Sequence, residues 1–97
     1  MDSGEVLEGA IVRDLLITNK RGLHARASAK FVQLVEGYDA EVAVSKDSQT
    51  VGGTSIMGLM MLAASPGTTI RVAARGRQAN EVLDAITTLV EAKFYEE

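Results

Sequence analysis

The sequence predicts an α+β open-faced β-sandwich, in which a mostly antiparallel four-stranded sheet carries three helices on one face. Strand-like and helix-like periodicities alternate along the chain in the order β-α-β-β-α-β-α. The connections between them are about two to six residues long, as in a compact domain. The 97 residues are enough for one small domain with its own core. We therefore expect a single domain over residues 11–97, after a flexible, acidic lead over residues 1–10.

The first strand and the first helix are predicted from a change in periodicity near residue 25. Residues 11–18 are rich in Ile, Val and Leu and run into a turn at residues 19–22. From Ala25 onward, apolar residues recur at helical spacing, and Gly37 is expected to end the helix in the left-handed conformation that glycine tolerates. The apolar residues of this helix are Ala27, Phe31, Leu34 and Val35.

The middle of the chain predicts a hairpin. Residues 40–45 alternate, with Val42 and Val44 on one face and Glu41 and Ala43 on the other, which suits a half-buried strand. Residues 46–49 have turn chemistry, and a short return strand begins at residues 50–51 and ends at the two glycines that follow.

The last elements are a short helix, a strand and a long helix. Ser55 is placed to cap a helix over residues 56–63, which must stop at the serine, proline and glycine of residues 65–67. Residues 68–74 alternate as a strand, and an amphipathic helix follows it. The residues at helical spacing in this final helix are Val82, Leu83, Ile86, Leu89, Val90 and Lys93.

Composition excludes several classes of function. A net charge of −3 disfavours nucleic acid as a partner. The absence of cysteine excludes a disulfide scaffold and a thiolate metal site, and a single histidine leaves carboxylates to supply nearly all ligands of any metal. The longest apolar run, residues 56–64, is about half the length of a membrane span. With no secretory signal visible, we expect a cytoplasmic protein without a membrane partner.

His24 is the first candidate for chemistry. It lies at the entry to the first predicted helix, where the unpaired N–H groups of Ala25, Arg26 and Ala27 converge and favour phosphate. The helix dipole disfavours imidazolium there, which leaves neutral imidazole as a nucleophile, and Arg26 can donate two parallel N–H bonds to phosphate oxygens. A transient phosphohistidine fits this arrangement, and so does a solvated turn histidine. The spacing alone does not choose between them.

Two motifs lie far apart in the chain, GLHARAS at residues 22–28 and TSIMGLM at residues 54–60. The first closely resembles the active-site signature of the HPr family, the phosphocarriers of the bacterial phosphoenolpyruvate-dependent phosphotransferase system. The second resembles the signature around that family's regulatory serine. The resemblance extends over residues 11–93 and implies the same open-faced β-sandwich, an HPr-like fold.

The resemblance also implies roles for matching residues. His24 is expected to accept a phosphoryl group on Nδ1 from enzyme I and to pass it to an enzyme IIA component. Arg26 is expected to pair with the phosphoryl group during in-line transfer. No metal or organic cofactor is implied, and the protein is expected to be a monomer that carries phosphate rather than a catalyst in its own right.

Ser55 has two roles that can both hold. Its place before the short helix predicts an N-cap, and the resemblance implies that an HPr kinase/phosphorylase modifies it in some bacteria. The helix that follows is apolar nearly all round, which by residue type alone indicates core. The resemblance instead assigns Ile56, Met57 and Met60 to an exposed docking patch.

Four cations form a local basic cluster within this acidic protein, namely Lys20, Arg21, Arg26 and Lys30. They are either ordinary solvated charge around a turn or a surface that steers acidic partners toward the histidine.

Other features leave alternatives open. Ala27 stands where the family signature has proline, which bears on the rigidity of the loop and not on the existence of the helix. We hypothesise regulatory, nitrogen-related duty rather than sugar transport. A docking module that is never phosphorylated and an enzyme with His24 as general base are the competing classes. The enzyme would need an oriented carboxylate, and no acidic residue lies near His24 in the sequence.

Overall fold

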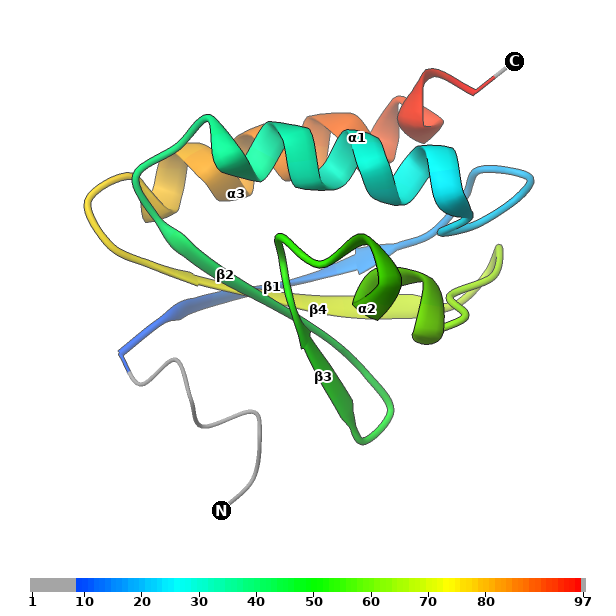
Figure 1. Cartoon of the computed structure of the whole chain (residues 1–97), viewed down its shortest axis with the longest axis horizontal. Helices are drawn as coiled ribbons and strands as arrows, with labels where there is room; N and C mark the ends of the chain where they lie inside the picture. The colour runs from blue at the N-terminus through cyan, green and yellow to red at the C-terminus, as the bar shows by residue number, and fades with distance from the viewer. Residues whose placement is uncertain (1–8, 97) are drawn as a thin grey trace.

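The computed structural model describes residues 9–96 and has the predicted α+β architecture (Figure 1). Its four strands form one antiparallel sheet in the order β1-β4-β2-β3. They are β1 (Ile11–Leu16), β2 (Glu41–Lys46), β3 (Gln49–Gly52) and β4 (Thr69–Arg75). The predicted open-faced β-sandwich is therefore confirmed. Most of the flexible lead expected over residues 1–10 lies outside the described residues.

Three helices cover one face of the sheet and leave the other face open (Figure 1). They are α1 (Ala25–Glu36), α2 (Ile56–Met61) and α3 (Ala79–Glu91), and a 3-10 turn, η2 (Lys93–Tyr95), follows α3. Helix α3 packs on β1 and β4, α1 packs on both other helices, and α2 packs on β3. This layering brings the start of α1 and the turn after α3 to the same end of the molecule (Figure 1).

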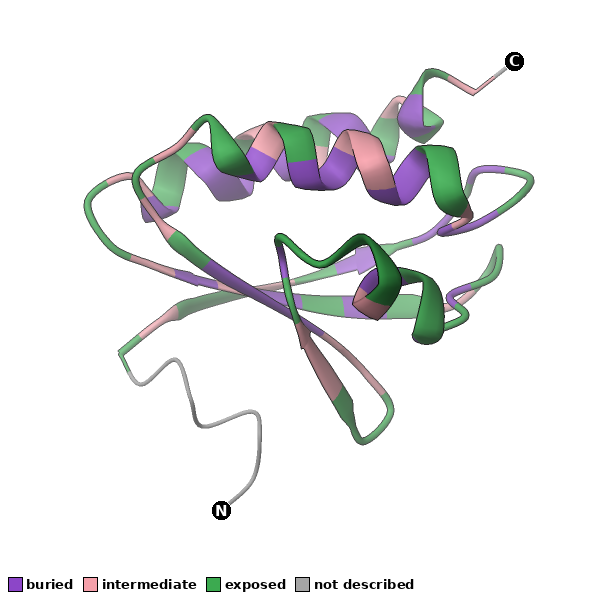
Figure 2. Cartoon of the chain, in the orientation of Figure 1, coloured by how far each residue is buried: buried purple, intermediate pink, exposed green. Residues whose placement is uncertain are grey.

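The core lies between the helices and the sheet (Figure 2). In β4, Ile70, Val72 and Ala74 alternate inward and are fully buried, as the period of two predicts. Val42 and Val44 of β2 lie opposite Ala74 and Val72. The helices contribute the buried side chains of Phe31, Leu59, Val82, Leu83 and Ile86.

The end of α1 differs in detail from the prediction. The helix stops before Gly37 as expected, but the predicted left-handed conformation is wrong, because Gly37 has a φ of −83°. The Gly37 N–H donates to the carbonyl of Leu34 at 3.1 Å, and the Tyr38 N–H donates to that of Val35 at 3.1 Å. These bonds pair the last carbonyls within a right-handed turn, so no left-handed residue is needed there.

The prediction that Lys93 belongs to the final helix is also wrong. Helix α3 ends at Glu91, and Lys93, Phe94 and Tyr95 have φ values of 57°, 56° and 55°. This left-handed turn follows α3, and its Phe94 side chain is buried to 1% exposure. Burial of the aromatic ring is the physical reason why the helix stops short.

The loop before His24 is braced by the loop after α2. Gly22 has a φ of +63°, and a Cβ at this position would collide with the carbonyl oxygen of Ala64. The next residue, Leu23, donates its N–H to that same carbonyl at 2.9 Å. Only glycine therefore fits at position 22, and the backbone that leads into His24 is fixed by a neighbour about 40 residues away in the chain.

Candidate functional site at the start of α1

His24 is the N-cap residue of α1, where the sequence placed it. Its backbone is extended, its N–H donates to the carbonyl of Gly22 at 2.9 Å, and its carbonyl accepts from Ser28 at 2.9 Å. Its side chain makes no capping hydrogen bond. The N–H groups in the first turn of α1 are therefore left for another acceptor, as the prediction required.

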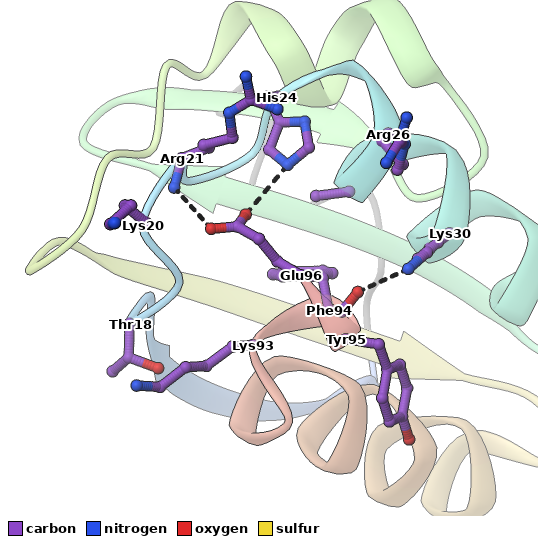
Figure 3. Close-up of a pocket in the computed structure, with 11 residues that line it drawn as sticks. Thr18, Lys20, Arg21, His24, Arg26, Lys30, Lys93, Phe94, Tyr95 and Glu96 are labelled. Atoms are coloured by element: carbon purple, nitrogen blue, oxygen red, sulfur yellow. Dashed lines mark hydrogen bonds and ion pairs between the residues drawn. The ribbon is translucent and has the colours of Figure 1, made fainter.

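The imidazole has a carboxylate partner. Its Nε2 lies 3.2 Å from Oε1 of Glu96, and the histidine side chain is 24% exposed (Figure 3). No group in residues 9–96 forms a hydrogen bond or ion pair with Nδ1. A carboxylate only accepts hydrogen bonds, so this contact puts the ring proton of neutral His24 on Nε2 and the lone pair on Nδ1.

Glu96 is itself held by two further donors. The side-chain amide of Asn19 donates to Oε1 at 2.9 Å. The backbone N–H of Arg21 donates to Oε2 at 3.2 Å, a contact drawn in Figure 3. The Asn19 bond is the main reason why the pKa of Glu96 lies below its ordinary value. Partial burial opposes this lowering, while the Arg21 N–H and His24 reinforce it. The carboxylate is thus stabilised in its charged form.

No acidic residue lies near His24 in the sequence, but the fold brings one to its side chain. Glu96 lies 72 residues further along the chain, and only the left-handed turn η2 brings it to the ring. The acidic residues at the end of the chain are visible in the sequence. Hydrophobic periodicity, however, does not predict where residues beyond the end of a helix lie in the fold.

The histidine lies in a hollow to which five Lys and Arg side chains contribute (Figure 3). The predicted basic cluster is brought together there, and Lys93, which was expected on a helix, joins it. These residues are Lys20, Arg21, Arg26, Lys30 and Lys93. Arg26 has no hydrogen-bond or ion-pair partner within residues 9–96, so its guanidinium is available to an anion.

Lys30 has a structural role in this hollow. Its Nζ donates to the carbonyl of Phe94 at 2.8 Å and lies 5.8 Å from the centre of the Tyr95 ring (Figure 3). Lys30 therefore ties α1 to η2. This use was not visible in the sequence, where the lysine was only a member of a charged cluster.

Ser55 and the apolar residues after it lie outside the hollow, on α2. The Ser55 Oγ accepts from the N–H of Gly58 at 2.9 Å, which confirms the predicted N-cap. The predicted patch is exposed, at 40% for Ile56, 73% for Met57 and 42% for Met60. Met61, at 66%, extends this exposed surface, although the family resemblance did not assign it to the patch.

The described part of the chain offers little else for chemistry. No group of three or more His, Asp or Glu residues within 9–96 is arranged to hold a metal ion. Over the same residues, no helix is both long and apolar enough to cross a bilayer.

An antiparallel open-faced sandwich with a histidine at the N-cap of α1, beside unpaired N–H groups and cations, fits the class of small phosphoryl-transfer proteins. A family model described as the PTS HPr component phosphorylation site matches residues 11–92. The chain belongs to this HPr family, and it is a phosphocarrier of the phosphotransferase system. Proteins of the family act in that system together with enzyme I and enzyme IIA components.

Individual relatives agree with this assignment. The phosphocarrier protein HPr of Neisseria meningitidis serogroup A is 49% identical over 82% of this chain and 90% of its own length. The phosphocarrier protein NPr of Shewanella violacea is 42% identical over 87% and 92%. The crystal structure of HPr from Thermoanaerobacter tengcongensis superimposes with a TM-score of 0.85 at 39% identity, over 90% of this chain and 98% of that one.

Proposed function

We propose that His24 carries the phosphoryl group on Nδ1, takes it from enzyme I and gives it to an enzyme IIA component. The observation that supports this most is the free Nδ1 beside the first turn of α1, with Nε2 engaged by Glu96. In the first step, the Nδ1 lone pair bonds to phosphorus while the bond from phosphorus to the donor atom breaks. The donor atom leaves with that electron pair, and transfer to enzyme IIA repeats the exchange with His24 as donor.

The surroundings of Nδ1 favour the charge of a phosphoryl group. The N-terminus of α1 directs its unpaired N–H groups and the positive end of its dipole toward the same region. Arg26, on the first turn, is free to donate to two phosphoryl oxygens. We assign Arg26 the role of pairing with the phosphoryl group during transfer.

The test is phosphoryl transfer with purified proteins. The protein is incubated with enzyme I and phosphoenolpyruvate, and its intact mass is measured beside that of His24→Ala. We expect a gain of one acid-labile phosphate that is absent in the variant, with an NMR correlation that places phosphorus on Nδ1. A protein that gains no phosphate would instead be the docking module, and phosphate that persists in His24→Ala would move the site elsewhere.

We infer that partners dock on two adjoining surfaces. The exposed residues of α2, Ile56, Met57 and Met60, supply apolar area, and the cations Lys20, Arg21 and Lys30 supply charge at the hollow. Apolar side chains beside a basic rim suit a partner with an acidic, partly apolar face. Enzyme I and enzyme IIA would then use the same surface in turn, which a carrier requires.

Ser55 is proposed as a regulatory site for an HPr kinase/phosphorylase. It is exposed and begins the α2 docking surface, so a phosphate there adds about two negative charges beside the partner contacts. These charges would repel an acidic partner without rebuilding the fold. Incubation with the kinase and ATP, with Ser55→Ala as control, tests this assignment by mass.

We further propose that the carrier serves the nitrogen-related branch and works in the cytoplasm, where phosphoenolpyruvate is made. Its relatives include both an HPr and an NPr, so the branch needs a direct comparison. Faster phosphorylation by nitrogen-type than by sugar-type enzyme I would support the regulatory assignment. Residues 11–97 are proposed to act as one domain, and removal of residues 1–10 should leave both rates unchanged.

A further inference from the structure

The C-terminal turn η2 is held in a conformation that its residues do not favour. Lys93, Phe94 and Tyr95 all have left-handed φ values although each has a Cβ. Two contacts of Phe94 hold the turn in place. Its ring is buried, and its backbone carbonyl accepts a hydrogen bond from Lys30. The turn ends by delivering the Glu96 carboxylate to the histidine.

The position of the carboxylate is specified in detail. Asn19 is fully buried, and its Nδ2 donates both to the carbonyl of Gly22 and to Glu96. Because the Gly22 carbonyl and the Glu96 carboxylate can only accept hydrogen bonds, the NH₂ group of the Asn19 amide must face them. Its buried Oδ1 is left without a partner in residues 9–96. The left-handed backbone of η2 and the unpaired, buried Oδ1 of Asn19 both lower the stability of the fold. Both occur where Glu96 contacts His24, which is typical of a functional site.

We infer that Glu96 is a positioning residue for phosphoryl transfer. Its carboxylate keeps the His24 proton on Nε2, which leaves the Nδ1 lone pair directed away from η2, and it balances the positive charge that the ring gains when Nδ1 bonds to phosphorus. This inference rests on the proposed function of His24. Glu96 does not touch the phosphoryl group in this scheme, and acts only through the ring.

The charge distribution around the ring agrees with this role. Among residues 9–96, Glu96 is the only acidic residue that lines the hollow, and the other charged side chains that line it are those of Lys and Arg. A carboxylate placed next to Nδ1 would repel the incoming phosphoryl group. On Nε2, at the far side of the ring, it stabilises a developing imidazolium while the cations remain available to the phosphoryl oxygens.

The test measures the histidine tautomer and the transfer rate on the same variants. The chain has one histidine, so two-bond proton–nitrogen NMR spectra of labelled protein report on His24 alone. In Glu96→Gln the new amide can donate to Nε2, which favours the tautomer with its proton on Nδ1. Glu91→Gln is the matched control, because Glu91 is exposed at the end of α3 and does not line the hollow.

We expect the Nε2-protonated tautomer to predominate in the wild type and in Glu91→Gln, and to lose population in Glu96→Gln. The rate of transfer from phosphorylated enzyme I should fall about 10-fold or more in Glu96→Gln only. Glu96→Asp keeps the charge but shortens the reach, so it should lie between wild type and Glu96→Gln. Thermal unfolding of each variant checks that the fold persists.

Two failures are distinguishable. If the wild type takes phosphate and Glu96→Gln matches it in tautomer or in rate, the positioning role is overturned while the proposed function of His24 stands. If the wild type takes no phosphate at all, the proposed function itself fails, and the positioning role fails with it.

Discussion

The N–H of Leu23 donates to the carbonyl of Ala64 at 2.9 Å, which joins the loop before His24 to the loop after α2. The histidine and the exposed α2 surface, which lie in separate motifs of the sequence, are therefore parts of one braced unit. The contact depends on Gly22, because a larger residue at that position would push the Ala64 carbonyl away.

Gly22→Ala should destabilise the protein through this contact. The substitution combines a left-handed φ with a Cβ that has no room, and we expect the free energy of unfolding to fall by about 1–3 kcal/mol. Urea unfolding measures the change. Gly52→Ala is the control, since a Cβ at Gly52 would meet no atom within 4 Å, and comparable losses for both variants would contradict the argument.

Arg26→Ala should slow phosphoryl transfer from enzyme I by about 100-fold, the typical effect of removing one donor to transition-state charge. Arg26→Lys should recover part of the rate, because lysine keeps the charge but not the two parallel donors. Rapid-quench measurements with phosphorylated enzyme I give these rates. Arg77→Ala serves as control, since Arg77 pairs with Asp39 outside the hollow.

The contribution of Glu96 to stability should depend on pH. Its pKa in the folded protein lies below the ordinary value of 4.5, so its carboxylate stabilises the fold above that value. The contribution is lost as the pH falls through the lowered pKa, because the folded state must then take up the proton. We expect the difference in unfolding free energy between wild type and Glu96→Gln to be largest near neutral pH.

Urea unfolding over a series of pH values checks this dependence. The difference should begin to shrink below about pH 4.5 and vanish at lower pH. A difference that grows on acidification would show that the carboxylate is not stabilised in its charged form.

Two residues of α2 should separate docking from stability. Met57 is 73% exposed, so Met57→Ala should weaken binding of enzyme I while changing the free energy of unfolding by less than about 0.5 kcal/mol. Leu59 is fully buried, so Leu59→Ala should destabilise the protein by about 2–5 kcal/mol. Calorimetric titration and urea unfolding give the two quantities, and unchanged binding in Met57→Ala would remove that residue from the docking surface.

Patterns over a few neighbouring residues were sufficient to predict most of the fold. The alternation of Ile70, Val72 and Ala74 and the cap at Ser55 depend on residues a few positions apart, and the structure confirms both. The exposure of Met57 was not decided by its residue type, which favours core, and it was the resemblance that assigned this residue to an exposed patch.

The sequence did not predict the part of the site that is formed by residues far apart in the chain. The contact between His24 and Glu96 depends on where α3 stops, and that is decided by burial of Phe94 rather than by any helix-breaking residue. The same burial displaced Lys93 from its expected helix into the hollow. Tertiary packing overrode helical spacing at this point.

The approach of η2 to the histidine also has a practical consequence for anyone who attaches a tag or a fluorescent protein. Glu96, the last residue that the structure describes, contacts His24 and lines the hollow (Figure 3). Strand β1 starts at the opposite end of the molecule (Figure 1). A fusion after residue 97 would crowd the partners of the carrier, whereas a fusion that enters through β1 would leave them room, so reporters and affinity handles belong at the N-terminal side.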